Sequence, residues 1–349
     1  MQDFFLKEEE LDNFQTQLIQ RNINHSMVVS GCAGSGKSLI ALWKAKQIHD
    51  LGESFYFVVY TKVLKKYFND GLKHITDPAL VDMRKMLDDE RKFFYYDNWN
   101  GGVGNVKFMI VDEAQDFDKN DIVRLKNAAQ TAVYYFGDSA QSIYKFRRQT
   151  IPMGEVARIV GLEAPEQLMH NYRLPKKIAR VAEIIGNVND LTWRCVKEGE
   201  HLPEKISCIN YNAQLDKIVE IINKQELTNV GILFSNNTKV RNAYEYLRTK
   251  GLSIEAKYDQ NRTTHMDLDF ASDNPKLMTY HSSKGLQFET VFIPDPTLFE
   301  RDENPCAPLY VAMTRTSDRL YFLYSGGEPT IFDTVRIDLF KNDNKIVQV

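Results

Sequence analysis

Short apolar runs and amphipathic segments alternate along this chain, and their order predicts an α/β fold. Runs of β-branched and aromatic residues are typical of buried strands, whereas helical spacing of apolar positions is typical of surface helices. In the first half, strands are predicted over 28–30, 54–60, 107–111 and 133–136, with a helix over 39–49. In the second half, strands are predicted over 205–211, 230–235 and 253–256, with helices over 213–224 and 239–250. Alternating strands and helices indicate parallel sheets.

The alternation stops near Ala164-Pro165 and then restarts. A chain of 349 residues is long enough for two domains, each with its own apolar core. We therefore expect an N-terminal domain over 1–164 and a C-terminal domain over 165–349. A further helix is expected to begin near Leu11, ahead of the first strand.

The first predicted strand leads directly into a phosphate-loop pattern. The segment Gly31-Cys32-Ala33-Gly34-Ser35-Gly36-Lys37-Ser38 fits G-x-x-x-x-G-K-[ST], and it lies between a strand and a helix as the pattern requires. Glycines allow backbone N–H groups to face a phosphate, and the helix N-terminus adds a favourable dipole. Lys37 would contact the β- and γ-phosphates, and Ser38 would ligate Mg²⁺. The alternative is a turn of small residues that merely fits the pattern.

Two adjacent carboxylates, Asp112 and Glu113, follow the apolar strand predicted over 107–111. Carboxylates at the end of a buried strand are costly unless a cation lies nearby. Mg²⁺ at the phosphate loop is the natural cation, held by Asp112, and Glu113 would then orient and deprotonate a water molecule. The alternative is an acidic helix N-cap.

Polar residues also follow the other predicted strands of the N-terminal half. Thr61 comes directly after the strand over 54–60, where ligands gather in open α/β sheets. Gln141 follows the strand over 133–136 and is placed to sense a γ-phosphate. Beyond it, Tyr144, Phe146 and Arg147 mix aromatic and basic groups, a combination suited to stacking on bases and contacting a nucleic-acid backbone. The alternative is an amphipathic turn that packs on the core.

Composition and charge limit the function classes. The content is ordinary for a globular protein, with 43% hydrophobic and 26% charged residues and a formal net charge of -3. That charge argues against nonspecific wrapping of duplex DNA, although a groove with local Lys and Arg could bind a single strand. No stretch is long and apolar enough to span a membrane, and the start of the chain is too acidic for a signal peptide. The four scattered cysteines form no C-x-x-C pair, so we expect a reducing cytosol and no disulfide framework.

Several strings, taken together and in order, resemble the superfamily 1 helicase motor of the UvrD/Rep/PcrA type. They are GCAGSGKS (31–38), VDEAQD (111–116), GDSAQSIYKFR (137–147), NYRLP (171–175), TYHSSKGLQFETVFI (279–293) and LYVAMTRTSDRLYF (309–322). The resemblance covers nearly the whole chain, 11–322. It implies two tandem RecA-like P-loop domains with parallel sheets and an ATP site in the cleft between them.

The resemblance also implies a role for individual residues around ATP and Mg²⁺. The adenine edge is read by Gln15, Tyr172 stacks on the base, and Gln287 stands where many relatives carry a ribose-binding Glu. The phosphates are bound by Gly31, Ala33, Gly34, Ser35, Gly36, Lys37 and Ser38, and Mg²⁺ by Ser38 and Asp112. The catalytic set is Lys37, Glu113 as the base, Gln141 as the γ-phosphate sensor, and Arg173 and Arg315 as arginine fingers. Single-strand contacts fall on Thr61, Tyr144, Phe146, Arg147, Thr279 and His281. Taken singly, Gln15 reads as a polar surface residue, His281 as a structural or surface histidine, and Arg173 and Arg315 as surface charges.

The chain departs from these relatives in lacking the large insertions that they carry within each motor domain. Our leading hypothesis is an ATPase that translocates on single-stranded DNA, 3′ to 5′ by family likeness, with RNA not excluded as a partner. The second hypothesis is an ATP-gated binding or sensing subunit that signals to a partner such as a nuclease. A third, a small-molecule kinase, leaves the NYR segment and the segment around His281 unexplained.

Overall fold

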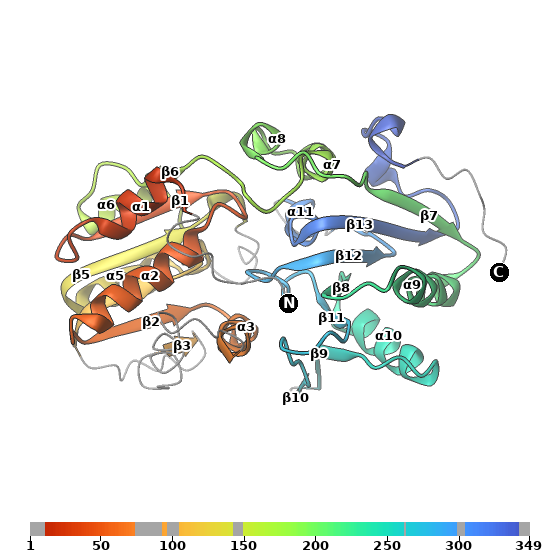
Figure 1. The fold of residues 1–349 in the computed structure, drawn as a ribbon, viewed down its shortest axis with the longest axis horizontal. Helices are drawn as coiled ribbons and strands as arrows, with labels where there is room; N and C mark the ends of the chain where they lie inside the picture. The colour runs from red at the N-terminus through yellow and green to blue at the C-terminus, as the bar shows by residue number, and fades with distance from the viewer. Residues whose placement is uncertain are drawn as a thin grey trace. The chain divides into compact units, whose positions relative to one another are not determined.

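The computed structural model describes residues 11–73, 93–95, 105–141, 149–261, 263–298 and 304–341. The chain divides into two compact units, one over Gln2–Asn171 and the other over Tyr172–Val349. Each unit is built on its own sheet with helices packed against it (Figure 1). The α/β class with parallel sheets, expected from the alternation of strands and helices, is confirmed.

In the N-terminal unit, the described strands form a six-stranded sheet in the order β3-β2-β4-β5-β1-β6, and every pairing is parallel. The strands are β1 (Met27–Gly31), β2 (Phe55–Val59), β3 (Phe93–Tyr95), β4 (Val106–Val111), β5 (Ala129–Gly137) and β6 (Glu166–Leu168). The helices are α1 (Asn13–Gln20), α2 (Lys37–Asp50), α3 (Lys62–Lys73), η3 (Ala114–Asp116), α5 (Lys119–Ala128), η4 (Ser139–Gln141) and α6 (Met153–Val160).

Two neighbouring tyrosines on β5 show how helices cover both faces of this sheet. Tyr135 donates from its hydroxyl to the carbonyl of Ile122 on α5, at 2.7 Å. The ring of Tyr134 lies instead beneath the ammonium of Lys44 on α2. Because successive side chains of a strand point to opposite faces, α5 and α2 cover opposite sides of the sheet.

In the C-terminal unit, the described strands form a seven-stranded sheet in the order β10-β9-β11-β8-β12-β13-β7. The strands are β7 (Glu204–Cys208), β8 (Val230–Phe234), β9 (Glu255–Gln260), β10 (Thr263–Met266), β11 (Lys276–Thr279), β12 (Phe288–Pro294) and β13 (Thr316–Ser325). The helices are α7 (Lys176–Gly186), α8 (Leu191–Arg194), α9 (Tyr211–Gln225), α10 (Asn237–Thr249), α11 (Ala307–Met313), η5 (Thr330–Phe332) and η6 (Ile337–Leu339).

Helices α9 and α10 bury their apolar stripes on one face of this second sheet. Leu215 and Ile218 of α9 and Val240 and Leu247 of α10 belong to one fully buried cluster with strand residues such as Ile232. Helix α11 packs against α7 and β12. An added Cβ at Gly186 of α7 would lie 2.6 Å from the Tyr310 ring of α11, so close helix packing requires glycine there.

Three details of the structure differ from the sequence expectation. The N-terminal unit extends to Asn171 rather than to residue 164, because β6 pairs in parallel with β1. The strand expected over 205–211 ends at Cys208, since the Asn210 side chain accepts from the N–H of Ala213 and starts α9. The second sheet is not parallel throughout, because β10 pairs antiparallel with β9 as a hairpin. Among the described helices, none has the length and apolar content needed to cross a membrane.

Candidate functional site

Three segments of the N-terminal unit meet at one edge of its sheet. The phosphate loop follows β1, Asp112 and Glu113 follow β4, and Asp138 follows β5. Strands β4, β5 and β1 are consecutive neighbours and parallel, so their carboxyl ends lie at the same edge. This topology brings together residues that are far apart in the sequence.

The phosphate loop is held in a shape that glycine alone adopts without strain. Gly34 and Gly36 have φ of +75° and +87°, in the left-handed region. A Cβ at Gly31 would lie 2.6 Å from Ser35 Oγ and 2.8 Å from Leu168 Cβ. Lys37 donates from Nζ to the carbonyls of Gly31 and Cys32, at 2.8 and 2.9 Å. The loop therefore wraps around the buried Lys37 ammonium and continues into α2.

The hydroxyl of Ser38 donates to Asp112 Oδ2 at 2.6 Å, which joins the phosphate loop to the end of β4. The other carboxylate oxygen of Asp112 accepts from the backbone N–H of Glu113 at 3.0 Å. Burial and the neighbouring Glu113 charge raise the pKa of Asp112 to about 7. The anionic form of Asp112 is therefore disfavoured at this site.

Glu113 has a left-handed backbone, with φ 55° and ψ 40°, which is uncommon for a residue with a Cβ. It occupies the N-cap position of η3, but its side chain makes no capping hydrogen bond there. Its carboxylate instead accepts from Nε2 of Gln115, and Gln115 Oε1 accepts from the backbone N–H of Asp138 at 2.8 Å. Glu113 is thus linked through Gln115 to the loop after β5. Glu113 is thus an N-cap by position, but its carboxylate bonds to Gln115 and not to the helix N-terminus.

Gln141, expected to sense a γ-phosphate, is buried at the end of η4. Its side chain donates from Nε2 to Asp138 Oδ2 at 2.6 Å. Gln141 and Gln115 both contact Asp138, so the loop after β5 and the segment after β4 share one hydrogen-bonded network.

Gln15 is buried rather than on the surface, and it contacts the phosphate loop. Its Nε2 donates to the carbonyl of Ser35 at 3.0 Å, and its Oε1 accepts from the N–H of Asp12 at 3.0 Å. Asp12 in turn accepts from the N–H of Gln15, which completes a capping box at the start of α1. Both ends of the Gln15 amide are therefore engaged within the N-terminal unit.

Two threonines expected to contact a single strand serve as caps in the structure. Thr61 Oγ1 accepts from the N–H of Leu64 at 3.1 Å, at the start of α3. Thr279 Oγ1 accepts from the N–H of Ser282 at 3.1 Å, in the turn after β11. The hydroxyl of each threonine thus organises the turn that follows its strand.

The two arginines expected to act as fingers converge on Thr314 within the C-terminal unit. Arg173 donates from Nη2 to the Thr314 carbonyl at 2.9 Å. Arg315 donates from Nη2 to the Thr314 hydroxyl at 3.1 Å, and from Nε to the carbonyl of Val311 at 2.9 Å. Only 2% of Arg315 is exposed, so its guanidinium is part of the interior of this unit and not a surface charge. Tyr172, His281 and Gln287 are half-buried.

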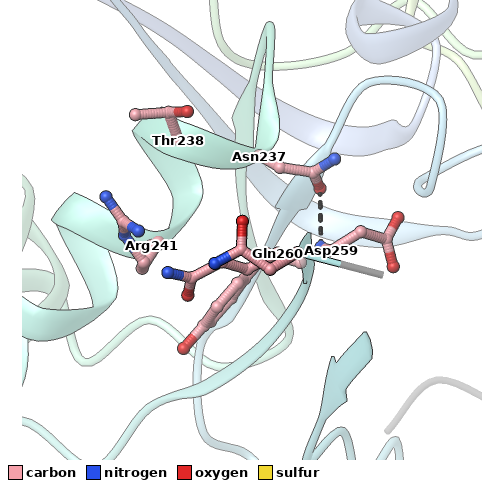
Figure 2. A pocket seen from close by; sticks show the side chains of 7 residues that line it. Asn237, Thr238, Arg241, Asp259 and Gln260 are labelled. Atoms are coloured by element: carbon pink, nitrogen blue, oxygen red, sulfur yellow. Dashed lines mark hydrogen bonds between the residues drawn. The ribbon is translucent and has the colours of Figure 1, made fainter. Parts of the chain in front are cut away.

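A polar hollow of about 400 Å³ lies at the carboxyl edge of the second sheet. It is formed where α10 begins after β8 and where β9 ends, and Figure 2 shows the Asn237 side chain meeting the backbone of Asp259 there. Within the described part of the chain, the contacts of Arg241 are long, at 3.4 Å to Asn242 and 3.8 Å to Glu245. The lining residues are Asn237, Thr238, Arg241, Tyr258, Asp259, Gln260 and Asn261.

Some expected site residues lie outside the described residues, and some contacts were not expected. Tyr144, Phe146 and Arg147 lie outside the described residues. Two features were not expected from the sequence. They are the link from Glu113 to Asp138 through Gln115 and the hollow around Arg241. Gln115 could have been found in the sequence as a polar residue two positions after the acidic pair. The hollow could not, because it lies between the start of α10 and the end of β9, which come together only when the chain turns back between these two elements.

Comparison with known proteins gives two family matches, one on each unit. Residues 15–147 match the family described as AAA domain, and residues 276–323 match the UvrD-like helicase C-terminal domain. A protein of Acanthamoeba polyphaga mimivirus, described as a candidate ATP-dependent DNA helicase, is 25% identical over 244 residues. That match covers 62% of this chain but 34% of the viral protein, so the chain spans about a third of its relative.

Among solved structures, the chain is similar to the C-terminal domain of a possible DNA helicase from Lactobacillus plantarum WCFS1. The identity is 18% and the TM-score 0.37, with 48% of this chain and 96% of that chain covered. The two family matches coincide with the phosphate loop and acidic pair of one unit and with the segment from Lys276 to Leu323 of the other. The chain is therefore similar to the AAA domain family in its N-terminal unit and to the UvrD-like helicase C-terminal domain in its C-terminal unit.

Proposed function

We propose that this chain hydrolyses ATP with Mg²⁺ and couples hydrolysis to movement along single-stranded DNA. The observation that supports this most directly is the meeting of Lys37, Ser38, Asp112 and Glu113 at one sheet edge. These are the residue types that bind a triphosphate, hold its metal and activate a water molecule. The mimivirus relative is described as a candidate ATP-dependent DNA helicase, which agrees with this reaction.

The phosphate loop suits a triphosphate for two reasons. The buried Lys37 ammonium supplies a positive charge, and the loop opens into the N-terminus of the 14-residue helix α2. In addition, the buried Ser35 hydroxyl has no hydrogen-bond partner among the described residues. A buried polar atom without a partner is costly, and a phosphate oxygen would satisfy it.

The donor set at Ser38 and Asp112 fits Mg²⁺. The hydroxyl and carboxylate oxygens are 2.6 Å apart, and both are hard oxygen ligands. The raised pKa of Asp112 reflects a buried carboxylate beside Glu113, and a divalent cation would favour its ionised form. When bound, the ion would neutralise charge that develops on the phosphates.

Glu113 is the candidate base for the attacking water, and Gln115 holds its carboxylate in place. Gln141 would contact the γ-phosphate from the loop after β5, exchanging its bond to Asp138 for one to the phosphate. Arg173 and Arg315 would supply the positive charge that the transition state requires. Tyr172 and Gln287 are proposed to contact the nucleoside, whereas the Gln15 amide contacts the phosphate loop.

The single strand is proposed to follow the carboxyl edge of the second sheet. Thr279 ends β11, which pairs in parallel with β8, and α10 begins just after β8. His281 and the hollow around Arg241 therefore follow neighbouring strands at one edge. Carboxamides and a guanidinium with few strong contacts suit a sugar-phosphate backbone and base edges. We propose a 3′ to 5′ direction from family likeness, and a protein partner such as a nuclease.

The proposed function is tested by the ATPase rate with and without single-stranded DNA or RNA. Streptavidin placed at either end of the strand then reports movement and its direction. Stimulation by DNA with displacement from one end would support the translocase. Stimulation without displacement would point to an ATP-gated sensor, and no hydrolysis under any condition would overturn the proposal.

A further inference from the structure

Lys44 of α2 is a fully buried lysine that the reaction proposed above does not use. Its ammonium donates to the carbonyl of Ile19 at 2.6 Å, to that of Arg21 at 2.5 Å and to Gln47 Oε1 at 3.0 Å. All three of its donors are therefore satisfied. Burial, with a smaller contribution from the Arg21 charge, lowers the pKa of Lys44 to about 8.

The carbonyls that Lys44 contacts are at the C-terminal end of α1. The last carbonyls of a helix have no partner within it, and they carry the negative end of the helix dipole. A lysine ammonium is the group that satisfies both the hydrogen bonds and the charge. Lys44 thus caps α1 from a different helix.

Helix α1 depends on such contacts because it is short. It has 8 residues, and isolated helices of that length are marginal in water. Leu18 and Ile19 bury its apolar side. Its two ends are held by polar contacts. Lys44 holds the C-terminal end, and the capping box of Asp12 and Gln15 forms the N-terminal end.

The N-terminal end of α1 lies on the phosphate loop. Gln15 donates to the Ser35 carbonyl, and a Cβ at Gly36 would lie 2.5 Å from Gln15 Nε2. The loop residues that Gln15 contacts are the two that directly precede Lys37. A displacement of α1 would therefore move Gln15 away from the segment that presents Lys37 and Ser38.

We propose that α1 is a brace for the phosphate loop, with Gln15 and Lys44 as positioning residues at its two ends. The brace keeps the loop ready for the phosphates, and it acts on any ligand that carries the polyphosphate chain. It does not depend on the base, because both ends of the Gln15 amide are engaged by the protein. This inference rests on the proposed nucleotide site, and it assigns Gln15 a role different from reading adenine.

The test compares Mg-ATP with inorganic tripolyphosphate as ligands of the full chain. Dissociation constants are measured by titration calorimetry for wild type, Lys44→Met, Gln15→Ala and the double variant. Lys46→Met is the matched control, since Lys46 is on the same helix and pairs with Asp50 instead of α1. Melting curves establish that each variant is folded, and kcat is measured at saturating ATP.

We expect Lys44→Met and Gln15→Ala each to weaken both ligands by about 3- to 10-fold, the effect of one or two lost hydrogen bonds. The double variant should be no weaker than either single one, because the two residues act through the same helix. Lys46→Met should bind as wild type does, and kcat should change less than KM. If Lys44→Met does not fold, Gln15→Ala tests the proposal by itself, because it leaves the contacts of Lys44 at the C-terminal end of α1 in place.

Two results would overturn the brace. One is wild-type affinity for tripolyphosphate in folded Lys44→Met or Gln15→Ala. The other is a loss of ATP affinity with tripolyphosphate unaffected, which would mean that Gln15 reads the base. If wild type itself binds neither ligand, it is the proposed nucleotide site that fails, and the two failures are distinguishable.

Discussion

Ser38 and Asp112 are joined by a 2.6 Å hydrogen bond between a hydroxyl and a buried carboxylate. The contact links two segments on either side of β5 in the sheet order, β1 and β4. Because burial and Glu113 raise the pKa of Asp112 to about 7, the ionised carboxylate is held there at a cost in stability. This relationship gives a prediction in which function and stability change in opposite directions.

Asp112→Asn should abolish Mg-ATP hydrolysis and yet stabilise the protein at pH 8. The folded pKa of about 7 lies above the ordinary 3.8, so the folded state binds this proton more tightly than the unfolded state. The contribution of Asp112 to the free energy of unfolding therefore decreases as pH rises from about 4 to 7. In Asp112→Asn this decrease is absent, because asparagine does not titrate. The gain at pH 8 is on the order of a few kcal/mol. Urea unfolding at pH 5 and 8, without nucleotide or Mg²⁺, measures it; an equal or lower stability of Asp112→Asn at pH 8 would contradict the prediction.

Glu113→Gln should bind ATP as wild type does but turn it over at least 10²-fold more slowly. An amide cannot take the proton of the attacking water, and general-base catalysis is typically worth about 10²- to 10⁴-fold. The fold should persist, because the new Gln oxygen can still accept from Gln115 Nε2. Binding of a fluorescent ATP analogue and a single-turnover assay separate the two steps. Hydrolysis near the wild-type rate would mean that Glu113 is not the base.

Lys37→Ala provides the contrast, because it removes the cation around which the loop is folded. Nucleotide affinity itself should fall, whereas Glu113→Gln leaves it intact. The same two assays measure both variants. Unchanged affinity in a folded Lys37→Ala variant would place the phosphates elsewhere.

Arg173→Lys and Arg315→Lys should both lose ATPase activity, by about 10³-fold or more, but only the second should lower the melting temperature. Arg315 is buried and donates to the Val311 carbonyl and the Thr314 hydroxyl, and a lysine cannot reproduce this planar set. Arg173 is less buried, and it donates to the Thr314 carbonyl. Calorimetric melts and steady-state rates test the pair. A normal rate in Arg173→Lys would remove that arginine from the catalytic set.

Arg241→Ala should weaken binding of single-stranded DNA and lower its salt dependence by about one ion per site. The reason is the loss of a guanidinium that lines the polar hollow (Figure 2). Arg248→Ala is the control, because Arg248 belongs to the same helix but lies over the Tyr244 ring, 5.5 Å from its centroid. Fluorescence anisotropy at several salt concentrations gives the slope. Equal slopes for both variants and wild type would exclude this hollow from the strand path.

The sequence predicts the elements with strong local patterns and misses those that depend on distant partners. Strands β2, β4 and β8 follow from their apolar runs, within a residue or two at each end. Strand β6, Glu166–Leu168, has no such pattern, and it is a strand because β1 provides its hydrogen-bond partners. Local propensity cannot reveal a pairing between segments so far apart.

The same limit applies to the site. The phosphate loop and the acidic pair are contiguous motifs whose chemistry can be inferred from the residues alone. The burial of Arg315 and of Gln15 could not be inferred from the sequence, because each is a polar residue of a type that usually lies on the surface. Ser35, Val311 and Thr314, which accept from them, carry no sign of that role in the sequence.

The position of β1 between β5 and β6 has a consequence for synthesis of the chain. The strand that leads into the phosphate loop, Met27–Gly31, leaves the ribosome before both of its neighbours in the sheet. Its two neighbours are Ala129–Gly137 and Glu166–Leu168, and it pairs with both in parallel. Until residue 168 has emerged, the nascent chain therefore exposes an apolar strand with at least one unpaired edge, which is the kind of segment that aggregates or recruits a chaperone. The strand that positions the phosphate loop thus gains both of its neighbours only after Glu166–Leu168 has been synthesised.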